Sequence, residues 1–206
     1  MAPPAEVQRI GVLGGTFDPP HHGHLIVAAD VHAALGLHRT LLVPAAVPPH
    51  KRHTVQASPE ARLEMLRAAV RGDPRFEVDD LELRRPGPSY TVDTLRALRE
   101  RYPGAELFFV IGADNVQELG SWREPEEIVR LARIVAVPRG CENADADAPF
   151  PFLSVPVSRV GISATDIRRR VAAGESIRYL VPDPVRDVVA REGLYREPVP
   201  SGKNPC

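Results

Sequence analysis

The chain has 206 residues, of which 43% are hydrophobic and 26% charged, and its formal net charge is −1. This balance provides no overall attraction to nucleic acid or to an anionic membrane, and no apolar run approaches the roughly 18 residues of a membrane span. The first residues, MAPPAEVQR, lack the apolar stretch of a secretory signal. The length predicts a single domain over 1–206. Two isolated cysteines, Cys141 and Cys206, favour a reducing, cytoplasmic location.

The first predicted strand ends in a turn that is suited to phosphate. The apolar run Ile10 to Leu13 leads into Gly14-Gly15, and a helical pattern follows. Glycine lets the backbone approach a ligand closely, and the amides at a helix start favour an anion. His21 and His24 are three residues apart, so they share one face at the start of that helix.

The rest of the chain alternates strand and helix patterns. Ser58 and Ser163 are predicted helix caps, and the helix after Ser58 has an apolar stripe made of Leu63, Leu66 and Val70. Strands are expected at 40–43, 76–83 (one or two), 107–111, 134–137 and 153–157, and further helices at 91–102, 126–131, 164–173 and 183–192. Strands that are apolar throughout and alternate with helices predict a mostly parallel sheet covered on both faces, a Rossmann-like three-layer α/β/α fold.

In such sheets, ligands bind at the carboxyl ends of the strands, near the point where the strand order reverses. Gly15 and the segment 112–114 (GAD) both follow predicted strands, so we expect both at that edge. The P-loop pattern does not occur, and the spacing of Gly11, Gly14 and Gly15 differs from that of the dinucleotide fingerprint. A P-loop kinase and a dehydrogenase of that type are therefore disfavoured.

The histidines raise the alternative of a zinc site. All seven precede residue 54, and H-x-x-H occurs at 21–24 and at 50–53. Zinc hydrolase signatures place the histidine pair four apart with a glutamate between them, and neither cluster has this form. We therefore predict no resident metal site.

Two segments resemble the signatures of one superfamily. Residues 14–24, GGTFDPPHHGH, match the nucleotidyltransferases with an H-x-G-H motif, and GISATDIRRRV at 161–171 is similar to their second signature, I-S-x-T-x-I-R. Further segments resemble one group within that superfamily, the nicotinate-mononucleotide adenylyltransferases. These segments are VPPHK at 47–51, PSYTVDTL at 88–95, VIGADNVQELGSW at 110–122 and the ending VPDPV…EGLYR.

The resemblance covers residues 9–196. The first eight residues and the tail after Arg196 fall outside it and are predicted to be disordered. The segment 139–152, RGCENADADAPFPF, departs from the family pattern. Because of this departure, the segment gives no basis for inferring how copies of the chain assemble, and a homo-oligomer stays an open alternative.

The resemblance implies that the phosphate of nicotinate mononucleotide attacks the α-phosphorus of ATP, which gives nicotinate adenine dinucleotide and pyrophosphate. A phosphate monoester has a second pKa of about 6, so the nucleophile is ionised near neutrality and needs no general base. Mg²⁺ is expected on the triphosphate without a dedicated protein cage. A related enzyme that adenylylates nicotinamide mononucleotide or phosphopantetheine is the nearest alternative, and a catalytically silent nucleotide-binding regulator is another.

The resemblance also implies roles for particular residues. His21, His24 and Arg168 become the catalytic groups on the ATP phosphates. The remaining ATP-binding residues are Gly14, Gly15, Thr16, Phe17, Asp114, Ile162, Ser163 and Thr165. The acceptor would be bound by Lys51, Tyr90, Thr91 and Trp122, with the tryptophan stacked on the pyridine ring. Asp18 would repel phosphate as a carboxylate, so it either orients a histidine or holds backbone.

Overall fold

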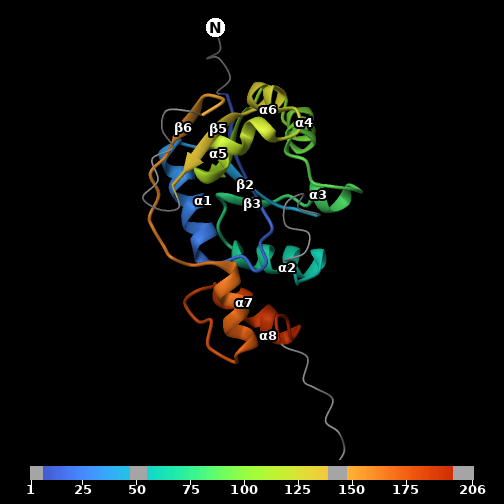
Figure 1. Cartoon of the computed structure of the whole chain (residues 1–206), viewed down its shortest axis with the longest axis vertical. Coiled ribbons are helices and arrows are strands. Elements are labelled where there is room, and N and C mark those ends of the chain that lie inside the picture. The colour runs from blue at the N-terminus through green and yellow to red at the C-terminus, as the bar shows by residue number, and fades with distance from the viewer. Residues whose placement is uncertain (1–6, 47–54, 139–147, 197–206) are drawn as a thin grey trace, which may run out of the picture.

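The computed structural model of the chain describes residues 7–46, 55–138 and 148–196. A six-stranded sheet forms its centre, in the order β3-β2-β1-β4-β5-β6 (Figure 1). The strands are β1 (Arg9–Gly15), β2 (Arg39–Pro44), β3 (Phe76–Val78), β4 (Glu106–Gly112), β5 (Arg133–Val137) and β6 (Phe152–Ser154). The helices are α1 (His22–Ala34), α2 (Pro59–Ala69), α3 (Leu81–Arg84), α4 (Thr91–Arg101), α5 (Asp114–Glu118), η1 (Leu119–Ser121), α6 (Pro125–Leu131), α7 (Ala164–Ala172) and α8 (Asp183–Arg191).

Every pair of neighbouring strands in this sheet is parallel, which confirms the predicted Rossmann-like class. Leu13 of β1 is in register with Leu42 of β2 and with Val110 of β4. The strand order reverses between β1 and β4, so the ligand-binding edge predicted from sequence lies where these two strands end.

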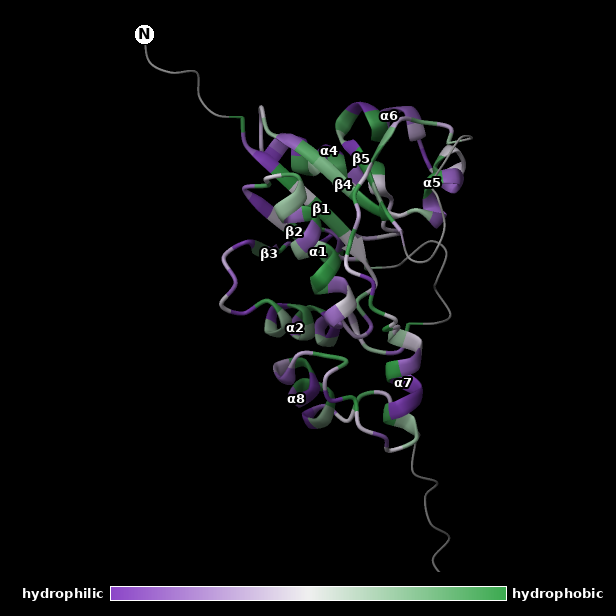
Figure 2. Ribbon diagram, turned by 90° about the vertical axis from the view of Figure 1, so that its left-hand side faces the viewer, coloured by the Kyte–Doolittle hydropathy of each residue, from purple (hydrophilic) through white to green (hydrophobic). Residues whose placement is uncertain are grey.

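Helices cover both faces of the sheet and complete three layers. On one face, α4 and α6 bury Leu95, Leu98 and Ile128 against β1, β2, β4 and β5. On the other face, α1 and α2 bury Ala28 and Leu66 against Leu42. The ribbon of β4 is coloured as hydrophobic (Figure 2), as expected for a strand buried on both sides.

The two C-terminal helices pack on α2 rather than on the sheet (Figures 1 and 2). Met65 of α2 lies in one apolar cluster with Ile167 of α7 and Val185 and Val188 of α8. Helix α2 is therefore held between the sheet and the C-terminal helices, so changes in α8 can reach the sheet edge through it.

Both predicted serine caps are present. The Ser58 hydroxyl accepts a hydrogen bond from the Ala61 amide at 3.1 Å, and the Ser163 hydroxyl accepts one from the Asp166 amide at 3.1 Å. These bonds satisfy amides that have no partner within the helix. The second motif therefore begins a helix, as the sequence predicts.

Several local predictions were wrong. The strand expected at 76–83 ends at Val78, because the Asp79 carboxylate accepts the Leu81 amide at 3.1 Å and turns the chain into α3. The strand expected at 153–157 is shorter, because β6 ends at Ser154, and the short α5 and η1 were not expected. Of the predicted α2 stripe only Leu66 is buried, since the helix turns Arg62 and Met65 to the interior instead. Among the described residues, we find no helix that could span a membrane.

Candidate active site

The glycine turn lies at the carboxyl end of β1, where the strand order reverses. Gly14 is exposed, and a Cβ added to it would meet Phe109 only at 4.0 Å. A Cβ on Gly15 would come within 3.1 Å of the Phe17 ring, which is buried beneath the turn with a φ of 50°. The space at Gly15 is therefore tight for any side chain, whereas the protein itself leaves room at Gly14.

His21 and His24 form a stacked pair at the start of α1. Their ring centroids are 3.7 Å apart, with 28° between the ring planes, and the edge of Phe17 supports His24 at 5.0 Å. The His21 amide donates to Nδ1 of His24 at 3.2 Å. Because Nδ1 is the acceptor, a neutral His24 carries its proton on Nε2 and can donate it from there.

His21 is almost fully buried, with 6% of its surface exposed. Burial lowers the pKa of its imidazole to about 4, and the neighbouring His22 adds a smaller effect in the same direction. Within the described part of the chain, its Nδ1 is buried and has no hydrogen-bond partner. Without a bound anion, His21 is therefore neutral near pH 7.

The second signature lies directly against the first. A Cβ on Gly23 would come within 3.0 Å of His21 Nδ1 and 3.7 Å of the Ile162 carbonyl oxygen, so glycine permits this close approach. Arg168 donates from Nη1 to the Asp18 carbonyl oxygen at 2.8 Å and from Nη2 to the Thr165 hydroxyl at 3.3 Å. The structure thus brings the two predicted ATP-binding segments together.

The Asp18 carboxylate holds backbone, one of the two roles left open by the sequence. It is 2% exposed and accepts the amides of Gln56 at 2.8 Å and Ala57 at 3.1 Å. The Tyr195 hydroxyl also donates to it at 2.7 Å. Burial, reinforced by the Asp18 charge, raises the pKa of Tyr195 above its usual value, so the phenol keeps its proton.

Two supporting residues were missed by the sequence analysis. Arg62 is buried in α2 and donates to the carbonyl oxygen of Thr16, and Tyr195 reaches Asp18 from beyond α8. A signal existed for Arg62, because it is three and four residues before Met65 and Leu66 and so shares their buried face. Tyr195 lies in the family-like ending EGLYR, but nothing in that segment indicates its bond to Asp18, which forms only after α8 packs on α2.

The predicted acceptor residues lie around the same edge. Tyr90 and Thr91 stand at the start of α4, and the preceding Ser89 hydroxyl accepts the Ala46 amide at 2.9 Å. Trp122 follows η1, and its ring meets the Phe109 ring edge-on at 6.2 Å. This Phe109 ring is also the nearest side chain to Gly14, so it connects the tryptophan to the glycine turn.

Asp114 and Lys51 are the remaining predicted site residues. Asp114 is exposed at the start of α5, directly after β4. Lys51 lies outside the described residues, as do His50, His53, both cysteines and residues 1–6 and 197–206 of the ends predicted to be disordered. Of the first eight residues, Val7 and Gln8 are described, and the Gln8 carbonyl oxygen accepts the Glu106 amide at 2.8 Å.

A buried acid supports the loop before α4. Glu82 accepts a hydrogen bond from the Thr94 hydroxyl at 2.6 Å, and burial raises the pKa of its carboxyl above the usual value. Arg85 donates to the same hydroxyl at 3.3 Å and makes a longer contact of 3.5 Å with the Tyr90 carbonyl oxygen. Glu82, Thr94 and Arg85 therefore form a small polar network that supports the Tyr90 backbone.

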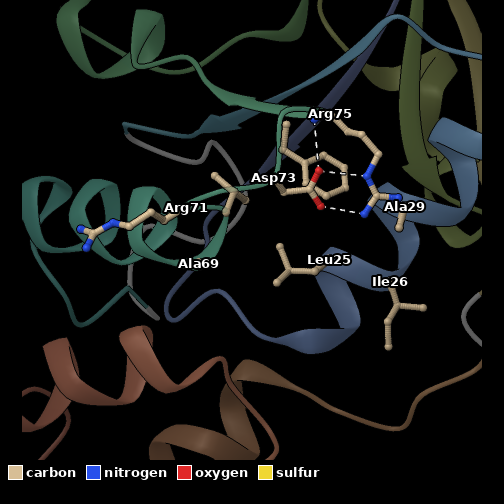
Figure 3. Close-up of a pocket in the computed structure, with 9 residues that line it drawn as sticks. Leu25, Ile26, Ala29, Ala69, Arg71, Asp73 and Arg75 are labelled. Atoms are coloured by element: carbon tan, nitrogen blue, oxygen red, sulfur yellow. Dashed lines mark hydrogen bonds and ion pairs between the residues drawn. The ribbon is translucent and has the colours of Figure 1, made fainter.

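A separate hollow lies beside α1 (Figure 3). Leu25, Ile26 and Ala29 form its apolar wall, and the Asp73 carboxylate accepts two hydrogen bonds from the Arg75 guanidinium at 2.9 and 2.6 Å. None of the predicted site residues lines it. The candidate site is accordingly the strand edge and not this hollow.

Comparison with known proteins places this site in a family. The sequence model of the family described as "Cytidylyltransferase-like" matches residues 12–170, which include the glycine turn, the histidine pair and most of the second signature. This chain belongs to that family.

Its relatives define the group more closely and confirm the predicted resemblance. A Thermus thermophilus protein named "Probable nicotinate-nucleotide adenylyltransferase" is 50% identical over 188 residues, which cover 91% of this chain and 100% of that one. A protein of the same name from Geobacillus thermodenitrificans is 45% identical over 187 residues, with 91% and 86% covered.

Solved structures show the same fold. The Plasmodium falciparum nicotinic acid mononucleotide adenylyltransferase complexed with NaAD aligns with a TM-score of 0.75 and covers 91% of this chain and 97% of its own. The two sequences are 19% identical, so this likeness concerns the fold alone.

Proposed function

We propose that this chain transfers the adenylyl group of ATP to nicotinate mononucleotide, giving nicotinate adenine dinucleotide and pyrophosphate. The observation that carries the proposal is the contact between the two signatures, in which Arg168 is bonded to Asp18 and the Ile162 carbonyl lies against Gly23. A stacked histidine pair, a capped helix start and a guanidinium then converge on one strand edge. The histidine pair, the helix start and the Arg168 guanidinium offer hydrogen-bond donors and positive charge, as a triphosphate requires, whereas the Asp18 carboxylate beside them is buried and occupied by its own donors.

In this proposal, the ATP phosphates lie against the turn formed by Gly14, Gly15, Thr16 and Phe17. The space beside Gly14 is not filled by the protein, and the φ of Gly14 is not positive. Its backbone conformation therefore does not require glycine, which fits close approach of a ligand. The β- and γ-phosphates lie toward Ser163 and Thr165 at the start of α7, with Arg168 beside them. Asp114, exposed after β4, is assigned to the ribose hydroxyls.

The reaction itself needs alignment rather than a base. An oxygen of the mononucleotide phosphate forms the new bond to the α-phosphorus, and the bond from that phosphorus to the bridging oxygen breaks, so pyrophosphate leaves with the electron pair. His24 donates from Nε2 to the α-phosphate as negative charge builds up, and neutral His21 donates beside it. Positioning contributes about 7–11 kcal/mol in such reactions, and each well-placed donor contributes roughly 3–4 kcal/mol.

The acceptor lies on the α4 side of the edge. We assign ring stacking to Trp122 and recognition of the nicotinate carboxylate to the Thr91 amide, where α4 begins. The Tyr90 amide, also expected in this role from the sequence, donates to the Pro88 carbonyl oxygen at 3.1 Å instead. Helix starts favour anions over neutral groups, so a carboxylate gains more there than an amide does. Lys51 is assigned to the incoming phosphate on sequence grounds.

Mg²⁺ is proposed to arrive with ATP. In the described ranges, no group of three or more His, Cys, Asp or Glu side chains is arranged so that it could hold a metal ion, and the donors at the site suit phosphate rather than a metal. The ion would therefore be held chiefly by the triphosphate, where it neutralises charge on the leaving pyrophosphate. Because the reaction uses ATP, we place the protein in the cytoplasm, and we propose no role for nucleic acid or a membrane.

Pyrophosphate release with ATP and each acceptor tests the proposal. Charge-assisted hydrogen bonds contribute about 1.5–3 kcal/mol, so nicotinate mononucleotide should exceed nicotinamide mononucleotide by roughly 10–150-fold in kcat/KM. Phosphopantetheine should give no release above background. Equal values for the acid and the amide would contradict the acid-specific assignment, and release with phosphopantetheine alone would favour the alternative acceptor. ATP binding without release from any acceptor would indicate a silent regulator.

A further inference from the structure

Arg62 is a buried cation whose partners are backbone carbonyls. It is 1% exposed, and among the ion pairs of residues 7–46, 55–138 and 148–196 none includes it. Its Nη1 donates to the carbonyl oxygens of Thr16 and Ala45, each at 2.8 Å, and Nη2 makes a longer contact of 3.5 Å with that of Ala46. A fully buried arginine without a paired carboxylate is unusual, so its position needs a reason.

Those carbonyls belong to two different parts of the candidate site. Thr16 lies in the glycine turn after β1, on the ATP side. Ala45 and Ala46 follow β2, and the Ala46 amide donates in turn to the Ser89 hydroxyl at 2.9 Å, directly before Tyr90 on the acceptor side. One guanidinium therefore connects the two halves of the site through bonded neighbours.

The charge of Arg62 is retained in this position. Burial lowers the pKa of its guanidinium, and the Asp18 charge opposes that effect. An arginine starts from so high a pKa that it stays protonated in proteins. Its guanidinium is hydrogen-bonded to Thr16, which lies in the turn that is assigned to the phosphates. Its positive charge therefore also stabilises the negative charge of the phosphates.

We propose that Arg62 is a positioning residue that holds the glycine turn and the end of β2 in one fixed relation, so that the ATP and acceptor sides of the site stay aligned. The inference rests on the proposed adenylyl transfer. Arg62 touches no substrate in this role and acts only through the backbone that it bonds. Small misplacements of reacting groups can lower rates by about 10²-fold, so loss of this alignment should lower kcat in a protein that is still folded.

The experiment compares Arg62→Lys and Arg62→Met with a matched pair, Arg99→Lys and Arg99→Met. Arg99 also donates to two carbonyl oxygens, those of Leu131 at 2.7 Å and Ala105 at 2.6 Å, but these lie before β5 and β4, at the opposite edge of the sheet. Melting temperature, kcat, KM for ATP and for nicotinate mononucleotide, and ATP binding by calorimetry are measured well below the melting temperature of every variant.

We expect Arg62→Lys to lower kcat by about 10–100-fold and to raise both KM values, while Arg99→Lys leaves all three unchanged, whatever its own loss of melting temperature. Arg62→Met should be worse than Arg62→Lys, because it loses the charge as well as the donors. Equal activity of the folded Lys variants at positions 62 and 99 would overturn the proposal. If the wild type forms no dinucleotide, adenylyl transfer itself fails, and the ATP-binding comparison still decides whether Arg62 holds the turn: weaker binding in Arg62→Lys alone supports it, and equal binding overturns it.

Discussion

The burial of His21 predicts a specific loss of stability in acid. Its pKa falls from the usual 6.5 to about 4 in the folded chain, chiefly because burial disfavours the charged ring. The unfolded chain therefore binds a proton at this position over a pH range in which the folded chain does not. The contribution to stability is fully present above pH 6.5 and is lost as the pH falls from there toward 4.

The size of the effect follows from the same values. One pKa unit corresponds to about 1.4 kcal/mol, so lowering the pH from 7 to 5 should reduce the free energy of unfolding by about 2 kcal/mol through His21 alone. Other groups titrate over this range too, including His32, whose pKa is also lowered by partial burial. A variant that lacks only His21 removes its contribution and leaves theirs in place.

His21→Asn is the suitable variant, because asparagine is neutral and is a favourable residue at a helix start. Urea unfolding of wild type and variant, followed by circular dichroism at pH 7, 6 and 5, gives the two dependences. The wild type should lose about 2 kcal/mol more than the variant between pH 7 and 5. Parallel curves for the two proteins would refute the buried, neutral His21.

Three further substitutions test other parts of the site. Arg168→Lys keeps the charge but loses the planar fork, so KM for ATP should rise more than KM for the acceptor; unchanged KM for ATP and kcat would make the arginine merely structural. Trp122→Ala should lower kcat/KM for both nicotinate and nicotinamide mononucleotides without reversing their order, and a reversed order would contradict simple stacking. Tyr195→Phe removes the hydroxyl bonded to Asp18 at 2.7 Å, which should cost about 2 kcal/mol, or about 4–8 °C of melting temperature. Tyr179→Phe, 78% exposed, is its control and should melt as the wild type does.

The position of the glycine turn and of the segment after β4 at one edge could be anticipated from local turn chemistry and parallel strands, whereas contact between the two signatures was implied only by the family resemblance. The glycine turn after β1 and the serine cap of α7 are short-range patterns. Parallel strands bring their carboxyl ends to one edge, so the turn and the segment after β4 had to meet there. These features are encoded over a few residues each.

The supports beneath the site could not be anticipated in the same way. The spacing of Arg62 from Met65 and Leu66 indicates a shared face, but which carbonyl oxygens it meets depends on how α2 packs between the sheet and α8. Tyr195 and Asp18 are 177 positions apart and meet because α8 docks on α2. Asp79 ended β3 early through a single side-chain bond to the Leu81 amide. Each of these depends on tertiary packing or on one hydrogen bond, and hydrophobic periodicity records neither.

Dinucleotide formation in wild type and His24→Ala tests adenylyl transfer at this site most directly. Purified protein is incubated with ATP, Mg²⁺ and nicotinate mononucleotide, and nicotinate adenine dinucleotide and pyrophosphate are both quantified. The wild type should form the two products in equal amounts, and a folded His24→Ala variant should lower kcat by roughly 10²–10³-fold, the scale for one charge-stabilising donor. Absence of the dinucleotide in the wild type, or near-normal turnover in the variant, would contradict adenylyl transfer by the H-x-G-H site.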